Sequence, residues 1–218
     1  MRRVLNWLSR KRFPYEPLIT VEISRSRLLH NLNQFRKLIP QGAVAPVLKS
    51  NAYGHGLFEV AGMLEDEPHI PFFVVDSYFE AVALRAKGWK KPLLIIGYTR
   101  SRTIMESSLK NIAFTITTLD TLKDIKDVTS TVHIHLKIDT GMHRQGILEE
   151  EALYAIEILR KNPRIFLEGI CTHLSDADNI DEIFTETQIA RWNKIVAEFK
   201  KSFPNIRYIH AAATDGSR

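Results

Sequence analysis

The chain alternates short aliphatic runs with amphipathic stretches, and this alternation limits the possible folds more than any other feature. We expect strands at seven runs rich in Val, Ile, Leu and Phe: residues 44–48, 72–75, 93–96, 114–116, 132–138, 167–173 and 208–212. We expect helices where apolar residues recur at three- and four-residue intervals: residues 57–64, 77–87, 118–128, 149–161 and 185–201. Each helix is long enough for a right-handed crossover between parallel strands. The pattern predicts an α/β fold.

Seven βα units indicate a (β/α)8 TIM barrel that lacks one unit, because an open seven-stranded parallel sheet is less frequent. A complete barrel needs about 250 residues, whereas this chain has 218. It stops directly after the seventh predicted strand, so we expect a truncated chain rather than a complete protein. Upstream, residues 19–23 resemble an extra strand, and Ser24 is expected to cap a helix with Leu28, Leu32 and Phe35 on one face.

Composition excludes several classes of protein. No stretch approaches the ~18 uninterrupted apolar residues of a membrane span. The single cysteine, Cys171, cannot form an internal disulfide, and the basic leader at residues 1–17 lacks the apolar core of a signal peptide. The net charge is +5, but basic and acidic residues are interspersed. We therefore expect a cytoplasmic protein that binds neither nucleic acid nor membrane.

Polar residues follow the predicted strands at their carboxyl ends, where barrel enzymes place their active sites. Lys49 ends the first strand, and a lysine partly desolvated in a barrel mouth can be a nucleophile that forms a Schiff base. From position alone, a lysine that reaches solvent is the favoured alternative. His173 and Thr214 follow later strands; taken singly, a structural histidine and a helix cap are the commoner roles.

The fifth predicted strand is unusually polar on one side. Strand alternation places His133, His135, Lys137 and Asp139 on the same face. Four polar groups make a poor core and need partners. A zinc site at His133 and His135 is not favoured, because no further His or Cys cluster supplies the remaining ligands. We therefore expect no metal.

Four strings resemble the signatures of one family. Residues 47–56, VLKSNAYGHG, closely resemble the pyridoxal-phosphate lysine motif of alanine racemases, and residues 137–146, KIDTGMHRQG, resemble their second signature almost residue for residue. Residues 169–173, GICTH, followed by SDAD, resemble the third, and residues 210–214, HAAAT, a drifted fourth. The resemblance implies a barrel of pyridoxal-phosphate fold type III over residues 18–218, the N-terminal domain of such an enzyme, cut after its seventh strand.

The resemblance also implies a role for each matching residue. Lys49 would hold pyridoxal 5'-phosphate covalently and act as the base on one face of it. Tyr53 and Thr214 would hold the phosphate, with Thr214 in place of the family's usual Ser, which keeps the hydroxyl. Ala213 stands where the family usually has Asn, which weakens the match of this loop.

Three further positions match residues around the cofactor ring. Arg144 would donate to the phenolic oxygen of the pyridine ring. Lys137 stands where many members carry a carbamylated lysine that positions this arginine, and a carbamate would make Lys137 an anion facing Arg144. His173 would lie beside the ring.

The implied activity is interconversion of L-alanine and D-alanine for cell-wall peptidoglycan precursors, with a small amino acid as substrate. In the family the opposite base is a tyrosine of a C-terminal domain, donated across a dimer interface. We therefore expect a homodimer for the full-length protein and no racemisation by the 218 residues alone. The main alternative is a single-domain pyridoxal-phosphate-binding homeostasis protein without racemase activity. That family shares the barrel but not the two longest strings, and the strings also disfavour fold-type III decarboxylases.

Overall fold

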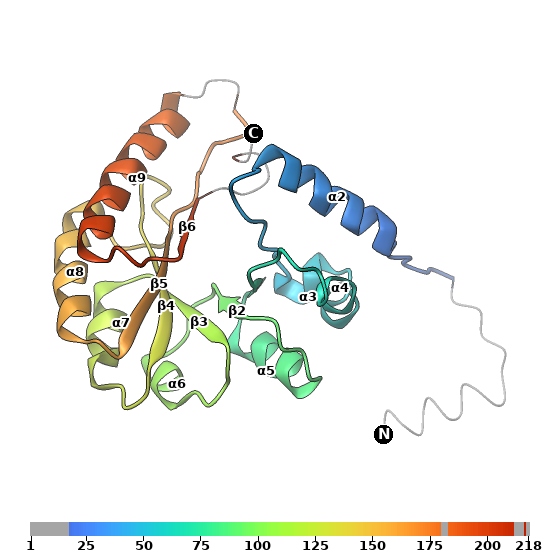
Figure 1. The fold of residues 1–218 in the computed structure, drawn as a ribbon, viewed down its shortest axis with the longest axis horizontal. Coiled ribbons are helices and arrows are strands. Elements are labelled where there is room, and N and C mark those ends of the chain that lie inside the picture. Colours follow the sequence, from blue (N-terminus) through green and yellow to red (C-terminus); the bar gives the residue numbers. More distant parts are fainter. Residues whose placement is uncertain (1–17, 180–182, 212–215, 217–218) are drawn as a thin grey trace.

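Six parallel strands form a curled sheet, a half-barrel, in which each strand pairs with its neighbours in the chain (Figure 1). The computed structural model describes residues 18–179, 183–211 and 216, so the predicted leader at residues 1–17 lies outside the described residues. The strands are β1 (Phe73–Val75), β2 (Leu93–Ile95), β3 (Ile112–Ile116), β4 (Val132–Lys137), β5 (Ile165–Cys171) and β6 (Tyr208–His210). The predicted α/β class with a parallel sheet is confirmed.

Helices connect the strands and cover the outer side of the sheet (Figure 1). They are α2 (Arg25–Leu38), α3 (Lys49–Tyr53), α4 (Leu57–Leu64), α5 (Tyr78–Ala86), α6 (Ser101–Glu106), α7 (Leu119–Asp124), α8 (Ala152–Lys161) and α9 (Ile183–Ser202), with 3-10 turns η1 (Ile125–Asp127) and η2 (Glu149–Glu151). Side-chain caps begin three of them, because the hydroxyls of Ser24, Ser77 and Thr118 accept hydrogen bonds from backbone N–H groups of α2, α5 and α7. In the described part of the chain, no helix is long and apolar enough to cross a membrane.

Two of the predicted strands are wrong. Residues 44–48 make only a single bridge, Val47 to Val74, because Pro46 has no N–H to donate and accepts one bond from Val74 at 2.9 Å. Residues 19–23 have no strand conformation, and Ile19 is 85% exposed, so its apolar side chain has no sheet to cover. The seventh predicted strand is β6, which ends at His210. Its predicted last residue, Ala212, lies outside the described residues.

Both faces of strands β1 to β5 are largely buried, as expected for parallel strands that carry helices, whereas Ile209 of the last strand, β6, is 37% exposed. Alternate residues in and just before β1 show this: Phe73 and Val75 belong to the main core beneath the helices, whereas Phe72 and Val74 belong to a smaller cluster on the inner face with Leu94. The inner face is therefore partly apolar, and polar side chains of β4 and β6 make up the rest of it.

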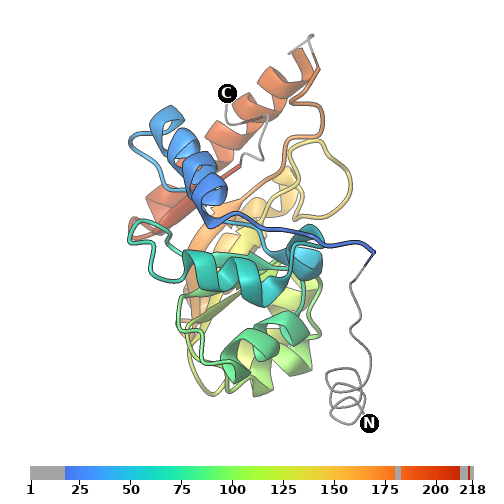
Figure 2. The same cartoon turned by 90° about the vertical axis from the view of Figure 1, so that its right-hand side faces the viewer.

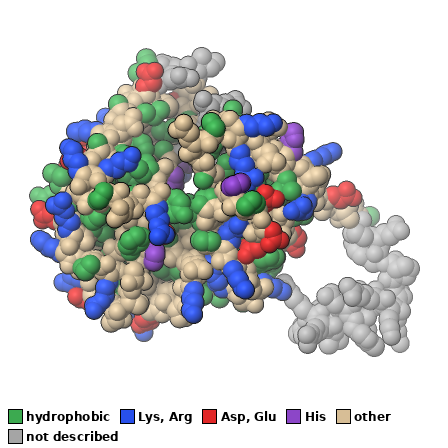
Figure 3. Space-filling model, viewed as in Figure 1, with side chains coloured by type: hydrophobic (Ala, Val, Ile, Leu, Met, Phe, Trp, Pro, Cys, Tyr) green, Lys and Arg blue, Asp and Glu red, His purple; other side chains and the backbone are tan. Residues whose placement is uncertain are grey.

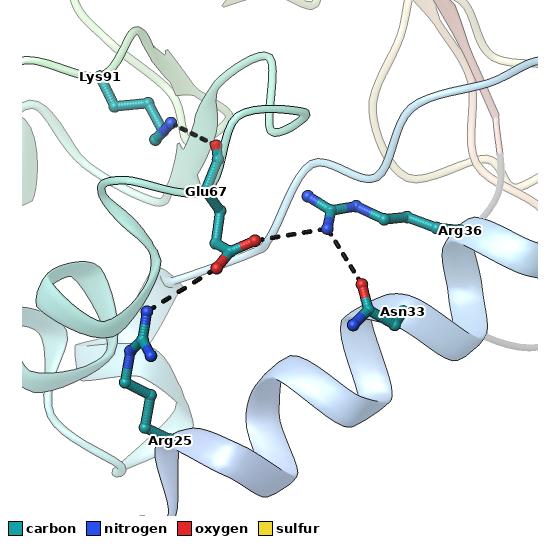
Figure 4. A network of polar contacts seen from close by, with 5 residues as sticks. All are labelled: Arg25, Asn33, Arg36, Glu67 and Lys91. Atoms are coloured by element: carbon teal, nitrogen blue, oxygen red, sulfur yellow. Dashed lines mark hydrogen bonds and ion pairs between the residues drawn. The ribbon is translucent and has the colours of Figure 1, made fainter.

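Helix α2 lies above α3 and α4 in both views and is attached by a charged network around Glu67 (Figures 1, 2 and 4). The Glu67 carboxylate lies 3.8 Å from Nη2 of Arg25 and 3.4 Å from Nη1 of Arg36. Nη1 of Arg36 also donates to Oδ1 of Asn33 at 3.1 Å, and Nζ of Lys91 donates to the Glu67 carbonyl at 3.1 Å. One acidic residue thus joins α2 to the segment after α4 and to the start of β2.

Candidate active site

Lys49 is followed by a left-handed turn. The φ angles of Ser50, Asn51, Ala52 and Tyr53 are 55°, 57°, 52° and 54°. For residues other than glycine, this conformation costs about 1–2 kcal/mol each. Such strain persists only where the surrounding structure holds it, and it clusters at functional sites. The sequence did not predict this turn, because a propensity pattern cannot distinguish it from a loop.

Glu80, in the first turn of α5, holds the left-handed turn in place. Its Oε1 accepts the N–H of Asn51 at 3.1 Å, and its Oε2 accepts the N–H of Asp76 at 2.8 Å. Oδ1 of Asn51 in turn accepts the N–H of Leu57 at 2.8 Å. The Ser77-x-x-Glu80 spacing is a capping-box signal that could have drawn attention to this carboxylate. Glu80 joins the Lys49 turn to the end of β1.

Asp139 shapes the loop that follows β4. Its Oδ1 accepts the N–H of Gly141 at 2.8 Å and the N–H of His143 at 3.1 Å. Burial alone would raise the pKa of Asp139, but these bonds, a backbone bond from Met142 and the charge of His143 outweigh it and lower the pKa. Gly141 has φ 138°, a value suited to glycine. This carboxylate therefore binds the backbone of the loop that carries Arg144.

Lys137 ends β4 among other basic groups. Burial lowers the pKa of Lys137, and the charges of Arg144 and Lys49 lower it further. Interactions with Cys171 and Asp139 raise the pKa of Lys137. Burial raises the pKa of the Cys171 thiol to about 12, so this group is not an anion near neutral pH. Arg144 and Lys49 are thus close enough to Lys137 for their charges to act on it.

His173 joins the same cluster from the end of β5. Burial lowers the pKa of His173, and the charges of Lys137, Arg144 and Lys49 lower it further. The Tyr53 ring lies 5.7 Å from Nζ of Lys49. The structure therefore brings together five of the six predicted site residues at the carboxyl ends of the strands. The sixth, Thr214, lies outside the described residues, as does Ala213.

A histidine pair occupies the inner face below this cluster. His135 is 1% exposed, and its Nδ1 lies 2.8 Å from Nε2 of His210, so one ring donates to the other. Burial lowers the pKa of both, that of His210 to about 4. A side chain at Gly169 would place Cβ 2.8 Å from the His135 ring, so glycine makes room for the pair. Strand alternation predicts that His135 needs a partner, but no pattern in the sequence identifies His210 as that partner.

His133 faces the same side of β4 with a different partner. Its Nδ1 lies 3.4 Å from the Glu168 carboxylate, which also lies 3.5 Å from Nη1 of Arg207. Glu168 can reach both because the pairing of β4 and β5 shifts by one residue between Ile134 and His135. Within the described residues, no group of three or more His, Cys, Asp or Glu could hold a metal ion.

The half-barrel also has a cavity of about 490 Å³, lined by Leu93, Asn111, Val132 and Tyr208 among others. These four residues lie at or just before the start of strands, so this part of the cavity is at the opposite end of the strands from the loops that carry Arg144 and His173, and its lining extends to His135. On the face drawn in Figure 3, the space-filling view shows an opening near the centre of the molecule, with histidine side chains beside it.

Comparisons with known proteins agree with this fold and with the family resemblance. The chain is 34% identical over 213 residues to an amino-acid racemase of Enterococcus faecalis, covering 96% of this chain and 30% of that protein. It is 34% identical over 198 residues to the alanine racemase of Carboxydothermus hydrogenoformans, covering 89% of this chain and 53% of that protein. The chain therefore spans about half, or less, of the length of these relatives.

Solved structures give the same result. The alanine racemase of Clostridium difficile 630 in complex with cycloserine matches with a TM-score of 0.83 and 31% identity, covering 91% of this chain and 57% of that one. The profile of the family described as alanine racemase, N-terminal domain, matches residues 23–218. Because this match covers nearly the whole chain, the chain belongs to the family of alanine racemase N-terminal domains.

Proposed function

We propose that residues 18–218, preceded by a basic leader at residues 1–17, are the N-terminal domain of a cytoplasmic, pyridoxal-phosphate-dependent racemase that interconverts L-alanine and D-alanine. The observation that carries this proposal is the gathering of Lys49, Lys137, Arg144 and His173 at one end of the sheet. Family membership and the names of the relatives support the same activity. In the whole protein, the half-barrel would be part of a (β/α)8 barrel.

The charge of the candidate site fits an anionic cofactor. Three basic groups take part in this cluster, because the charges of Lys49 and Arg144 both act on Lys137. Asp139, the carboxylate among them, accepts backbone N–H groups of its own loop. Among the described residues of this cluster the positive charge therefore lacks a full counter-charge, and a phosphate and a phenolic oxygen would supply one. The residues present thus fit pyridoxal 5'-phosphate.

Lys49, directly before the strained turn, would bind the cofactor covalently through Nζ and move a proton to and from the substrate Cα on one face. Bound pyridoxal phosphate supplies an electron sink that makes the Cα–H acidic. The hydroxyl groups of Tyr53 and Thr214 would bind the phosphate. The turn after Lys49, held by Glu80, would fix the backbone from which Lys49 reaches the cofactor.

Arg144 would donate a charge-assisted hydrogen bond to the phenolic oxygen. Burial lowers the pKa of Lys137, which increases the neutral amine, the form that can add carbon dioxide. A carbamate on Lys137 would place a negative charge beside Arg144 and hold its guanidinium in position. His173 would contact the ring from the neighbouring strand.

Racemisation needs a second proton-transfer group on the opposite face. The resemblance implies that a tyrosine from a partner subunit supplies it, so we propose that the whole protein is a homodimer. The residues of this chain would then supply cofactor binding and one of the two proton transfers.

The test uses alanine in deuterated buffer. The chain is incubated with pyridoxal phosphate and L-alanine, and deuterium at Cα is followed by NMR. The proposal predicts exchange above that of free pyridoxal phosphate, and loss of this excess in Lys49→Ala. Cofactor binding without exchange would contradict it and would fit a pyridoxal-phosphate-binding protein without racemase activity.

A further inference from the structure

Gln188 is a buried amide whose four hydrogen bonds all go to the two loops of the candidate site. It lies in α9 and is 0% exposed. Its Oε1 accepts the N–H of Ser175 at 2.9 Å and the Oγ hydroxyl of Ser175 at 3.1 Å. Its Nε2 donates to Oγ1 of Thr140 at 3.2 Å and to the carbonyl of His173 at 3.2 Å. The full hydrogen-bonding capacity of this amide is used.

The two loops are also joined directly, beside Gln188. Oγ1 of Thr140 lies 2.9 Å from Oγ1 of Thr172, and this pair is buried. On the next turn of α9, Nη1 of Arg191 donates to the carbonyl of Thr140 at 3.3 Å. A Cβ at Gly141 would lie 3.4 Å from Cγ of Gln188, so the helix packs closely on the loop backbone. Neither loop can move without breaking bonds to α9.

These contacts place Gln188 between two predicted site residues. One loop runs from Asp139 through Thr140 to Arg144, and the other contains His173 itself. Gln188 touches the loop backbone and hydroxyl groups rather than the basic side chains of the cluster. Its effect on the site therefore passes through the loop positions.

We propose that Gln188 is a positioning residue that fixes the Arg144 loop relative to His173, so that both can bind one cofactor together. The coupling of the two loops is inferred from their contacts alone. The identity of the cofactor rests on the proposed function. The buried face of α9 carries Gln188, Trp192, Ile195 and Phe199. A lone amide on an otherwise apolar face was the sequence signal for this role, because a buried amide needs partners.

The experiment compares three variants of the chain. Gln188→Met removes all four hydrogen bonds at similar volume, and Gln188→Glu keeps an acceptor for Ser175 but loses both donors. Ile195→Val, on the same buried face, is the matched control. Hydrogen–deuterium exchange of residues 139–146 and 172–176 is measured without cofactor, together with the thermal midpoint. The dissociation constant for pyridoxal phosphate is measured by absorbance titration.

Gln188→Met is expected to speed exchange in both loops together and to weaken cofactor binding about tenfold. Gln188→Glu should also speed exchange in both loops and weaken cofactor binding. This variant tests the proposal if Gln188→Met does not fold. Ile195→Val should lower the thermal midpoint while both loops exchange as in the wild type and the dissociation constant stays within about twofold. Unchanged exchange in folded Gln188 variants, or equal loosening by Ile195→Val, would overturn the proposal. If the wild type binds no cofactor, the proposed function fails, but the exchange comparison still decides the role of Gln188.

Discussion

Oε1 of Glu80 accepts the backbone N–H of Asn51 at 3.1 Å, which ties α5 to the left-handed turn after Lys49. The second carboxylate oxygen accepts the N–H of Asp76 at 2.8 Å, so one side chain holds two segments of backbone. Since the turn is strained, its conformation depends on such outside contacts. The geometry at Lys49 is therefore maintained in part by a residue of the next βα unit.

Replacing Glu80 should release this turn. We expect Glu80→Ala to lower the free energy of unfolding by about 1–3 kcal/mol, because two backbone N–H groups lose a charged acceptor. The measurement is urea denaturation, with cofactor titration alongside. Glu106→Gln is the control, since Glu106 pairs with Arg102 on an exposed helix surface and should change stability by no more than about 0.5 kcal/mol. Equal effects of the two variants would show that Glu80 does not hold the turn.

The buried histidine pair should make stability depend on pH. Burial lowers the pKa of His210 from 6.5 to about 4, so between these values the unfolded chain binds more protons than the folded one. Stability contributed by the neutral pair is present above about pH 6.5 and is lost as the pH falls toward about 4. Denaturation across this range should show a steeper fall in the wild type than in His210→Phe. The control is His69→Gln, at an exposed position, which should keep the wild-type slope. Equal slopes in wild type and His210→Phe would contradict the buried pair.

Gly169 should not accept a side chain. An added Cβ would lie 2.8 Å from the His135 ring, which is itself fixed by His210. We expect Gly169→Ala to destabilise the protein by about 1–3 kcal/mol through overpacking. Gly42→Ala is the control, because its nearest neighbour would be 3.5 Å away, at ordinary contact distance. A Gly169→Ala protein as stable as Gly42→Ala would mean that the ring has room to move.

Arg144 should contribute directly to cofactor affinity. Arg144→Gln removes one charge-assisted hydrogen bond, worth about 1.5–3 kcal/mol, so the dissociation constant for pyridoxal phosphate should rise roughly ten- to a hundredfold. Arg160→Gln makes the same change of charge on the exposed side of α8, at a distance in sequence from the site strings. Its dissociation constant should stay within about twofold of the wild type. An unaltered affinity in Arg144→Gln would place this residue outside the site.

The fold could be predicted from sequence where periodicity was long and regular. The helix at residues 57–64 and the parallel order of β1 to β6 follow from such patterns. Pro46 interrupts the expected first strand because it lacks an N–H, and α6 has only six residues, too few for a helical period to show. Residues 19–23 are apolar but have no neighbouring strand, which a local pattern cannot reveal.

Residues of the candidate site could be proposed from sequence where they lie within one motif, and not where their role depends on contacts between distant segments. Lys49, Lys137 and Arg144 stand in quoted motifs, and the structure brings them together. Glu80 holds the turn through a hydrogen bond to a residue 29 positions away in the sequence. The hydrogen-bond partners of Gln188 lie 13 to 48 positions away from it. Such pairings depend on the tertiary fold, so residue spacing alone could not identify them.

The most direct test of the proposed function is borohydride reduction of the chain with pyridoxal phosphate, followed by peptide mass spectrometry. The proposal predicts one reduced adduct, on Lys49, and its complete loss in Lys49→Ala. Lys87→Ala, at an exposed lysine, should be labelled on Lys49 as in the wild type. An adduct that persists in Lys49→Ala, or a wild-type adduct on another lysine, would contradict the assignment of the cofactor to this site.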